Sequence, residues 1–404
     1  MRTSIPDPVE YLDTVSLGEI ASTQYGVSVA LDPGGTTRIV GMQHVRDGKI
    51  LLHDLPRVSL SEAEKASFLL CEGDLLFNRT NSYDQVGKTG IVRCTDAEEA
   101  VFASYLVRLR ADRRRIMPEF LNYWMNSPSA VATLRALATP GVSQFNINPT
   151  VLRDRFRVPL PSLERQAAIV VALDTFDRHI HNTRSLCHSK REFRHGLTQR
   201  LFAERQHDYS PATSSDQTQP LERALSESRV LASTGQHARK LTIKLHGKGL
   251  VAKRDTRPGS ANTQYYRRSA GQFIYSKLDF LNGAFGIVPP ELDGYESTLD
   301  LPAFDISDDV NPRWLLQMFS WPGFYKRHLG LANGGRKARR VNPVQLLRVA
   351  ITFPPRDAQD QIADLLDACD QEVELLDKLT SALDRHKRAL FPKLLTGEIR
   401  VAAT

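Results

Sequence analysis

The second half of the sequence repeats the first, and no single motif constrains the fold of a chain as much as such a repeat does. When residues 354–394 are shifted back by 193 positions they align with residues 161–201, with nine identical positions. A duplication of this length predicts two copies of one structural plan and suggests pseudo-twofold symmetry. The identical pairs are Pro161 and Pro354, Gln166 and Gln359, Ile169 and Ile362, Leu173 and Leu366, Asp174 and Asp367, Asp177 and Asp370, Leu186 and Leu379, Leu197 and Leu390, and Leu201 and Leu394.

The two copies remain related further upstream, with small changes of offset. Residues 73–79 face 271–277 at an offset of 198, and residues 87–92 face 283–288 at an offset of 196. Such drift is typical of insertions in loops between related units. Each copy is therefore predicted to be one globular region followed by one long helix.

The globular regions are predicted to be of mixed α and β structure, which gives an α+β fold class. A helix is expected at about 118–137 and its counterpart at about 312–329, each beginning at a proline that suits the first helical turn. Short apolar or β-branched runs bounded by Gly, Asn and Asp predict strands. These runs lie at 68–70, 74–77, 90–92, 105–109 and 272–275.

Heptad patterns mark the long helix at the end of each copy, because apolar residues there alternate spacings of four and three. Each pattern runs for about 33 residues, which corresponds to about 50 Å of helix and exceeds what one small domain can cover. The natural partner of each helix is therefore the other helix, and Pro392 should end or kink the second one near its last turn. The predicted seam residues are Ile169, Leu173, Phe176, Ile180, Leu197, Leu201, Ile362, Leu366, Val373, Leu376, Leu383, Leu390 and Leu394.

A run of small and polar residues at 210–220 separates the copies and cannot form a core of its own. The sequence thus predicts five segments. They are a first globular domain at 1–158, a first helix at 159–203, a linker at 204–235, a second globular domain at 236–353, and a second helix with a C-terminal tail at 354–404.

Composition excludes several classes of protein. No apolar run of about 18 residues exists to cross a bilayer, and the first residues lack the apolar segment of a secretory signal, so a cytoplasmic protein is expected. The four cysteines include no Cys-x-x-Cys pair, which argues against a zinc module and a disulfide framework.

Catalytic motifs are missing as well. Neither Asn148-Pro149 nor Asn342-Pro343 continues into the second proline and aromatic residue of a methyltransferase base pocket. Gly87-Lys88-Thr89 lacks the earlier glycine of a phosphate-binding loop, and His179 and His181 point to different faces of a helix and cannot share a metal ion. We therefore expect a binding protein with no catalytic residue, no metal site and no cofactor.

Positive charge is concentrated in the second copy, where residues 236–257 contain seven basic residues and one acid. Amide and aromatic residues at 262–268 and a basic loop at 333–340 follow; the equivalent loop at 139–146 has different side chains, which suits two modules that read different sequences. Basic runs are more often solvated faces, but the cluster as a whole favours a phosphate-binding surface. The candidate nucleic-acid contacts are Gln43, His44, Arg46, Asn78, Arg79, Asn81, Ser143, Gln144, Asn146, Lys244, Lys253, Arg254, Arg257, Tyr265, Tyr266, Arg267, Arg268, Lys277, Arg336, Lys337, Arg339 and Arg340.

The order and duplication of several motifs resemble the DNA specificity subunit of type I restriction-modification systems, over nearly the whole chain. The pattern is broken at 354–359, where the usual leucine and glutamate are missing. The motifs that carry the resemblance lie at 73–79 with 87–91, at 158–169 running into Leu173-Asp174, at 271–288 ending in Pro289-Pro290, and at 394–401.

The resemblance implies two target-recognition domains separated by two long helices that form an antiparallel coiled coil. Each domain would read one half of a bipartite site in double-stranded DNA. The subunit would hold two modification (methyltransferase) subunits and, through them, restriction subunits that translocate and cut DNA, as in defence against phage. S-adenosylmethionine, ATP and Mg would be bound by those partners and not by this chain.

Two other functions stay open at this point. A scaffold protein could join subunits through its coiled coil without reading DNA, and it would lack salt-dependent, sequence-selective DNA binding. A self-sufficient nuclease or methyltransferase is disfavoured by the missing motifs, and binding of S-adenosylmethionine or a metal by the isolated chain would revive it.

Overall fold

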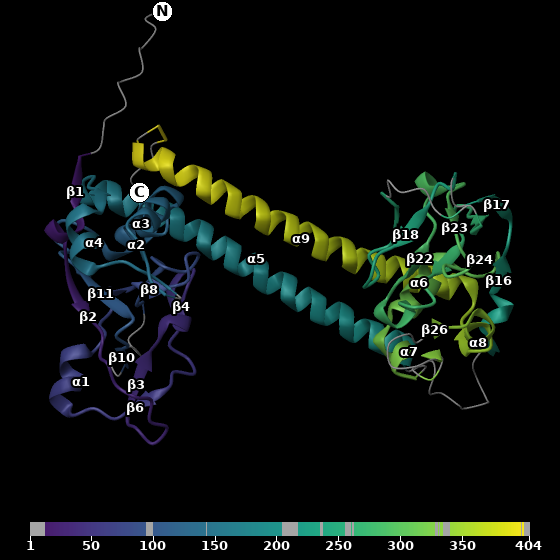
Figure 1. Ribbon diagram of the computed structural model, residues 1–404, viewed down its shortest axis with the longest axis horizontal. Helices are drawn as coiled ribbons and strands as arrows, with labels where there is room; N and C mark the ends of the chain where they lie inside the picture. Colours follow the sequence, from purple (N-terminus) through teal and green to yellow (C-terminus); the bar gives the residue numbers. More distant parts are fainter. Residues whose placement is uncertain are drawn as a thin grey trace, which may run out of the picture. The chain divides into compact units, whose positions relative to one another are not determined.

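The computed structural model divides the chain into two units, each of which combines one globular region with parts of both long helices. Unit 1 comprises Met1–Arg184 and Lys378–Thr404, and unit 2 comprises Ser185–Asp377. Figure 1 labels their helices and strands. The structure describes residues 13–93, 100–142, 144–203, 217–234, 237–254, 260, 262–327, 330, 332–333, 340–396 and 398–399.

The globular region of unit 1 is built on a six-stranded sheet in the order β2-β11-β7-β9-β5-β4. Its central strand β7 contains Leu75, Leu76 and Phe77, and all three side chains are fully buried. Both faces of the strand are covered, because Leu75 and Phe77 pack in the main core and Leu76 packs in a second hydrophobic cluster. The strands of this region are β1 Thr14–Ser16, β2 Ala21–Tyr25, β3 Thr37–Val40, β4 Val45–Arg46, β5 Gly48–Ile50, β6 Arg57–Val58, β7 Leu75–Asn78, β8 Thr80–Asn81, β9 Thr89–Ile91, β10 Ala100–Phe102, β11 Leu106–Ala111, β12 Thr139–Pro140, β13 Phe145–Asn146 and β14 Arg157–Pro159.

Unit 2 repeats the centre of this sheet. Its order β16-β24-β21-β22 matches β2-β11-β7-β9, with antiparallel neighbours throughout. The turns before β9 and β22 need a glycine in each copy, because Gly87 and Gly283 have φ values of +86° and +74°. The strands are β15 Gln217–Pro220, β16 Leu225–Ser228, β17 Leu231–Thr234, β18 Leu241–Ile243, β19 Leu250–Ala252, β20 Gln264–Arg267, β21 Phe273–Tyr275, β22 Phe285–Ile287, β23 Glu296–Ser297, β24 Ala303–Ile306, β25 Ala332–Asn333, β26 Arg340–Val341 and β27 Ala350–Phe353.

Each unit completes its hydrophobic core with residues from both long helices, α5 Leu163–Ala203 and α9 Arg356–Thr396. In unit 1, Leu173 of α5 and Phe391 and Leu394 of α9 lie in one cluster with the sheet. In unit 2, Leu366 of α9 and Phe202 of α5 have the equivalent places. The start of one helix and the end of the other are therefore part of the same globular core.

The helices pair in opposite directions within each unit, and ion pairs cross the seam (Figure 1). Unit 1 contains Arg184–Asp384 at 2.8 Å and Asp177–Lys387 at 2.5 Å. In unit 2 the cations come from α5 and the carboxylates from α9. The unit 2 pairs are Lys190–Glu372 at 2.8 Å, Arg191–Asp377 at 2.6 Å and Arg194–Asp370 at 2.9 Å.

The predicted fold class is confirmed. Every predicted seam residue, from Ile169 to Leu201 and from Ile362 to Leu394, is buried or half-buried, whereas most other positions of the two helices are exposed. The α9 helix continues through Pro392 to Thr396, so this proline does not end the helix.

The predicted helix at 118–137 is wrong in one respect, since the structure has two shorter helices there. Pro128 has no N–H to continue α2, and the Ser127 hydroxyl accepts a hydrogen bond from the Ala130 N–H to start a new helix. Pro322 divides the counterpart in the same way. The short α-helices of the chain are α1 Glu62–Phe68, α2 Pro118–Met125, α3 Pro128–Ala136, α4 Pro149–Arg155, α6 Pro312–Ser320, α7 Pro322–Arg327 and α8 Pro343–Leu347.

The predicted linker extends too far, and one predicted strand is absent. Residues 217–234 form β15, β16 and β17, and β15 pairs with β27 as β1 pairs with β14 in unit 1. Because the sequence of β15 is polar, it gave no indication that these residues form an edge strand. Residues 68–70 are the end of α1 and the loop after it, because the Ser61 cap starts a helix that runs through Phe68.

Within the part of the chain that the structure describes, none of the helices combines the length and apolar character that a bilayer span requires. Among the same residues, no group of three or more His, Cys, Asp or Glu side chains is arranged to hold a metal ion.

Candidate nucleic-acid interface

A buried glutamine fixes the globular region of each unit to the start of its long helix. In unit 1, Gln166 Oε1 accepts a hydrogen bond from the Met117 N–H at 2.8 Å, and its Nε2 donates to the carbonyls of Arg115 and Pro161. Gln359 makes the equivalent three bonds in unit 2, with the backbones of Asn311, Asp309 and Pro354. Both amides are almost fully buried, so the identical glutamines serve structure rather than DNA contact.

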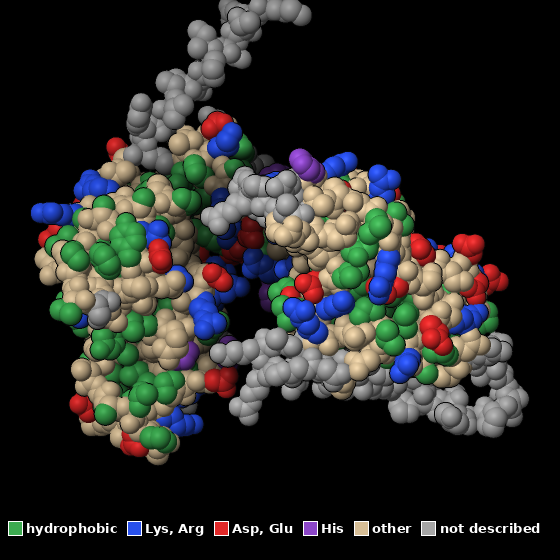
Figure 2. Space-filling view, turned by 45° about the vertical axis from the view of Figure 1, so that its right-hand side comes forward, with side chains coloured by type: hydrophobic (Ala, Val, Ile, Leu, Met, Phe, Trp, Pro, Cys, Tyr) green, Lys and Arg blue, Asp and Glu red, His purple; other side chains and the backbone are tan. Residues whose placement is uncertain are grey.

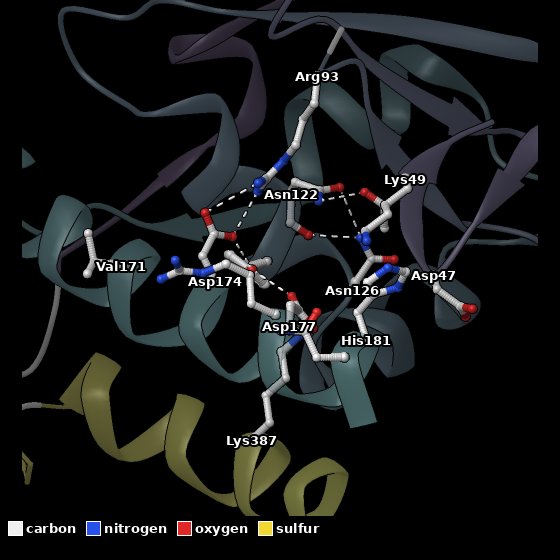
Figure 3. A pocket seen from close by; sticks show the side chains of 14 residues that line it. Asp47, Lys49, Arg93, Asn122, Asn126, Val171, Asp174, Asp177, His181 and Lys387 are labelled. Atoms are coloured by element: carbon white, nitrogen blue, oxygen red, sulfur yellow. Dashed lines mark hydrogen bonds and ion pairs between the residues drawn. The ribbon is translucent and has the colours of Figure 1, made fainter. Parts of the chain in front are cut away.

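A polar network joins α2 to both long helices in unit 1, beside a pocket of about 370 Å³ (Figure 3). The Tyr123 hydroxyl contacts Asp174 at 2.5 Å and Asp177 at 2.7 Å, while Arg93 and Lys387 pair with these carboxylates. Burial and the two carboxylates raise the pKa of Tyr123, so that its hydroxyl keeps its proton and donates.

In unit 2 an equivalent polar network, made of different residues, joins α6 to both long helices; we call the network of each unit its joint. Gln317 takes the place of Tyr123 and donates to Asp367 at 3.1 Å and to Asp370 at 3.4 Å. Arg194 takes the place of Lys387 and donates to Asp370 and to Gln317 Oε1. The repeat therefore preserves the geometry of the joint although the side chains differ.

The unit 1 joint predicts a loss of stability in acid. Burial alone would raise the pKa of Asp174, but hydrogen bonds from Arg93 and Tyr123 outweigh it and hold the pKa below the ordinary value of 3.8. A carboxyl with a lowered pKa stabilises the folded state above its unfolded pKa, and this contribution disappears as the pH falls through the folded pKa. We expect urea denaturation between about pH 3 and 6 to show unit 1 losing stability, with a weaker pH dependence in Asp174→Asn. Asp47→Asn, on an exposed turn, is the matched control and should behave as the wild type.

Aromatic and arginine side chains form a strip at one end of the unit 1 sheet, where β2, β7 and β11 meet β8 and β13. The Arg79 guanidinium lies 5.0 Å from the centre of the Tyr25 ring, and the Arg79 N–H donates to the Tyr105 carbonyl. Asn81 pairs with Phe145 across β8 and β13. We call this set the aromatic strip; its members are Tyr25, Arg79, Asn81, Tyr83, Tyr105, Arg135, Phe145 and Asn146.

The rings of the aromatic strip are accessible. Tyr25, Tyr83 and Tyr105 are each 49% exposed, although large aromatic residues usually lie inside. Tyr83 meets Phe145 edge-on at 5.1 Å, and Arg135 lies 5.5 Å from the Tyr83 ring. Exposed rings beside guanidinium groups and amides are typical of nucleic-acid surfaces.

The same backbone positions in unit 2 carry a cationic strip, defined as Lys277, Asp300 and Arg340. The Lys277 N–H donates to the Asp300 carbonyl at 2.9 Å, as the Arg79 N–H donates to Tyr105 in unit 1. The Val341 N–H donates to the Lys277 carbonyl at 2.8 Å, as the Ile147 N–H donates to Arg79. Lys277 therefore replaces Arg79, Asp300 replaces Tyr105, and Arg340 replaces Asn146.

A basic turn lies next to the cationic strip. The turn between β18 and β19 carries Lys244 and Lys248, both exposed, and it hydrogen bonds through the His246 N–H to the Asn282 carbonyl. The unit 1 counterpart is the turn between β4 and β5 with Arg46 and Lys49, which are also exposed. Figure 2 shows that, on the face in view, basic side chains are scattered among acidic and apolar ones on both units. On that face the basic side chains therefore do not form one broad positive surface.

Three predicted contact residues are buried, so the prediction is wrong for them. Arg268 is fully buried, and its guanidinium donates hydrogen bonds to Ser297 Oγ and to the carbonyls of Ser228 and Leu301. Asn78 is 1% exposed and His44 is 9% exposed, with His44 Nδ1 accepting a hydrogen bond from the Gly41 N–H. Their polarity suggested a surface role, but Arg268 and His44 bond to buried backbone and side-chain groups, and the Asn78 side chain lies inside the fold with its Oδ1 atom buried and without a hydrogen-bond partner.

The other predicted contacts are divided between accessible and undescribed positions. Ser143, Arg257, Arg336, Lys337 and Arg339 lie outside the described residues. The accessible or half-buried ones are Gln43, Arg46, Arg79, Asn81, Gln144, Asn146, Lys244, Lys253, Arg254, Tyr265, Tyr266, Arg267, Lys277 and Arg340. Sequence reasoning missed Tyr25 and Tyr105, because an isolated aromatic residue in or beside a strand pattern resembles a core residue. It also missed Tyr83 and Arg135, which lie in a turn and on α3 and have no local signal of their own.

The fold defines an internally duplicated α+β chain with two globular regions and a pair of long helices. Solved S subunits of type I restriction-modification systems share it: that of M. genitalium has a TM-score of 0.58 at 13% identity and covers 97% of this chain and 98% of its own. The HsdS subunit of Thermoanaerobacter tengcongensis has a TM-score of 0.52 at 18% identity, with the same coverage of 97% and 98%.

Sequence similarity agrees with the fold. The chain is 22% identical over 372 residues to a Methanocaldococcus jannaschii protein provisionally described as the type I restriction enzyme MjaX specificity subunit, covering 90% of this chain and 87% of that protein. No family model matches the chain. These similarities confirm the predicted resemblance: in sequence and in fold the chain is similar to type I restriction-modification specificity subunits.

Proposed function

We propose that this chain is the non-catalytic DNA specificity subunit of a cytoplasmic type I restriction-modification complex, in which each globular region reads one half of a bipartite site. The observation that carries this proposal is the shared backbone frame at the two strips. Arg79 and Lys277 have the same backbone partners, while the side chains around them differ in kind. The same backbone geometry with two different sets of side chains suits two domains that recognise different DNA sequences.

The partners follow from the same proposal. The chain would hold two modification subunits and, through them, restriction subunits, with S-adenosylmethionine, ATP and Mg bound by those partners. The duplicated joints at Tyr123 and Gln317 support this assignment, because they hold each reading region to the paired helices in the same way.

The decisive experiment is genome-wide mapping of methylated adenines. Cells that express this chain with its neighbouring modification subunit are compared with cells that lack this chain. We expect a split motif that disappears with the chain. A working modification subunit without any chain-dependent motif would favour the alternative, a scaffold that joins subunits without reading DNA.

Lengthening the paired helices should change the gap in the DNA site. Inserting one heptad into the middle of both α5 and α9 preserves the seam register and adds about 10 Å, or about three base pairs of DNA. We expect the motif from methylation mapping to keep its half-sites and to gain about three unspecified base pairs. The matched control inserts seven residues within 204–216 and should leave the gap unchanged. Altered half-sites with an unaltered gap would contradict the spacer role of the helices.

A further inference from the structure

The two strips occupy equivalent positions but offer DNA different chemistry. The backbone hydrogen bonds of Arg79 in unit 1 are repeated by Lys277 in unit 2, so the side chains around them can be compared position by position. Tyr105 corresponds to Asp300 and Asn146 corresponds to Arg340. Where unit 1 has the ring of Tyr105 and the amide of Asn146, unit 2 therefore has the ion pair between Asp300 and Arg340.

The arginines of the aromatic strip are held in place by protein groups. Arg79 donates from Nε to the Ser104 carbonyl at 3.3 Å and lies over the Tyr25 ring. Arg135 donates to the Asp84 carbonyl at 3.1 Å and lies over the Tyr83 ring. These guanidinium groups orient the rings. The half-buried amides of Asn81 and Asn146 are also held, because their Oδ1 atoms accept hydrogen bonds from the Ser82 N–H at 2.8 Å and the Thr80 hydroxyl at 2.9 Å. The surface offered to a ligand consists of the exposed tyrosines and the hydrogen-bonding capacity that these two amides retain.

The arginine of the cationic strip is held only by an exposed ion pair. Arg340 pairs with Asp300 at 3.3 Å, and the two side chains are 57% and 64% exposed. Exposed ion pairs contribute little to stability, so Arg340 can exchange this partner for a base edge at small cost. Lys277 lies beside this strand, because its carbonyl accepts a hydrogen bond from the N–H of Val341, the residue after Arg340.

We propose that unit 1 reads a half-site determined by A·T pairs and that unit 2 reads a half-site containing at least one essential G·C pair. The proposal rests on the proposed function. In the major groove, Asn and Gln amides bind adenine N6 and N7, and aromatic or apolar groups contact the thymine methyl group. Arg and Lys bind guanine O6 and N7. The aromatic strip matches the first set and the cationic strip matches the second.

Exchange variants test the proposal by methylation mapping with the modification subunit present. Arg340→Asn should relax one G·C position of a single half-site, with discrimination there falling roughly 5- to 150-fold, the range expected for one base-specific pair. The double variant Tyr105→Asp with Asn146→Arg brings the Asp300–Arg340 pair into unit 1 and should introduce a G·C preference into the other half-site. Arg348→Asn, at an exposed arginine that caps α8 in unit 2, is the matched control and should leave the motif unchanged.

The outcomes separate this inference from the proposed function. Each variant keeps one half-site intact, so methylation at sites selected through that half reports that the chain is folded. A split motif in which Arg340→Asn changes no position, or changes the same half-site as the double variant, would overturn the assignment of bases while leaving the specificity role standing. The absence of any chain-dependent motif in the wild type would overturn the proposed function, and this inference with it.

Discussion

Replacing Phe391 by alanine is expected to destabilise unit 1 by about 3–5 kcal/mol, because it removes a large buried ring from the core. Phe391 is 6% exposed and lies in the cluster that contains Leu75 and Phe77 of the sheet, with its ring 6.5 Å from that of Tyr123. Hydrogen exchange measured by mass spectrometry should show faster exchange of β7 and β11 in unit 1 and unchanged exchange of β21 and β24 in unit 2.

A matched control lies on the same helix. Leu379 is 48% exposed, and Leu379→Ala should change stability by no more than about 0.5 kcal/mol. Phe202→Ala should produce the opposite pattern, since Phe202 is buried in the unit 2 core beside Trp321. Equal loss of protection in both units after Phe391→Ala would contradict the division of the core that the structure shows.

Replacing Arg268 by methionine should destabilise unit 2 by roughly 3 kcal/mol or more, because three oxygen atoms around the buried guanidinium would each lose a hydrogen bond from a charged donor, at about 1–3 kcal/mol each. These oxygens are Ser297 Oγ at 2.7 Å and the carbonyls of Ser228 at 2.9 Å and Leu301 at 3.2 Å. Burial lowers the pKa of Arg268 to about 10, so the group remains charged at neutral pH. Urea denaturation of the full chain measures the effect.

The neighbouring arginine is the control for this variant. Arg267 is exposed at the end of β20, directly before Arg268, and Arg267→Met should leave the free energy of unfolding within about 0.5 kcal/mol of the wild type. A stable Arg268→Met protein that had lost DNA binding would show that Arg268 is a contact residue and would contradict its buried structural role.

The repeat and the helix seam could be predicted because both are periodic in the sequence. Leu173 and Leu366 stand at the same heptad position of their helices, and both are buried in the structure. The linker boundary could not be predicted, because β15 is a polar edge strand that exists only through its pairing with β27. Local composition carries no sign of a partner more than 100 residues away.

The candidate site was predicted only in part, for a related reason. Charge and polarity drew attention to Arg268 and Asn78, which the fold buries, since a buried polar side chain looks the same in sequence as one at the surface. Tyr25 and Tyr105 were missed because they come together only at the end of a sheet, from strands about 80 residues apart. The equivalence of Arg79 and Lys277, however, was already visible in the aligned repeat.

The distribution of each core over the chain also sets the order in which the protein can be completed during synthesis. Unit 2 is continuous in sequence, from Ser185 to Asp377, so its residues leave the ribosome as one block. Unit 1 must wait for Phe391 and Leu394, which are made about 10–40 s after its own α5 residues at ordinary rates of translation. The unit encoded first therefore closes its core last, and until then the nascent chain carries an exposed apolar groove where the end of α9 will pack.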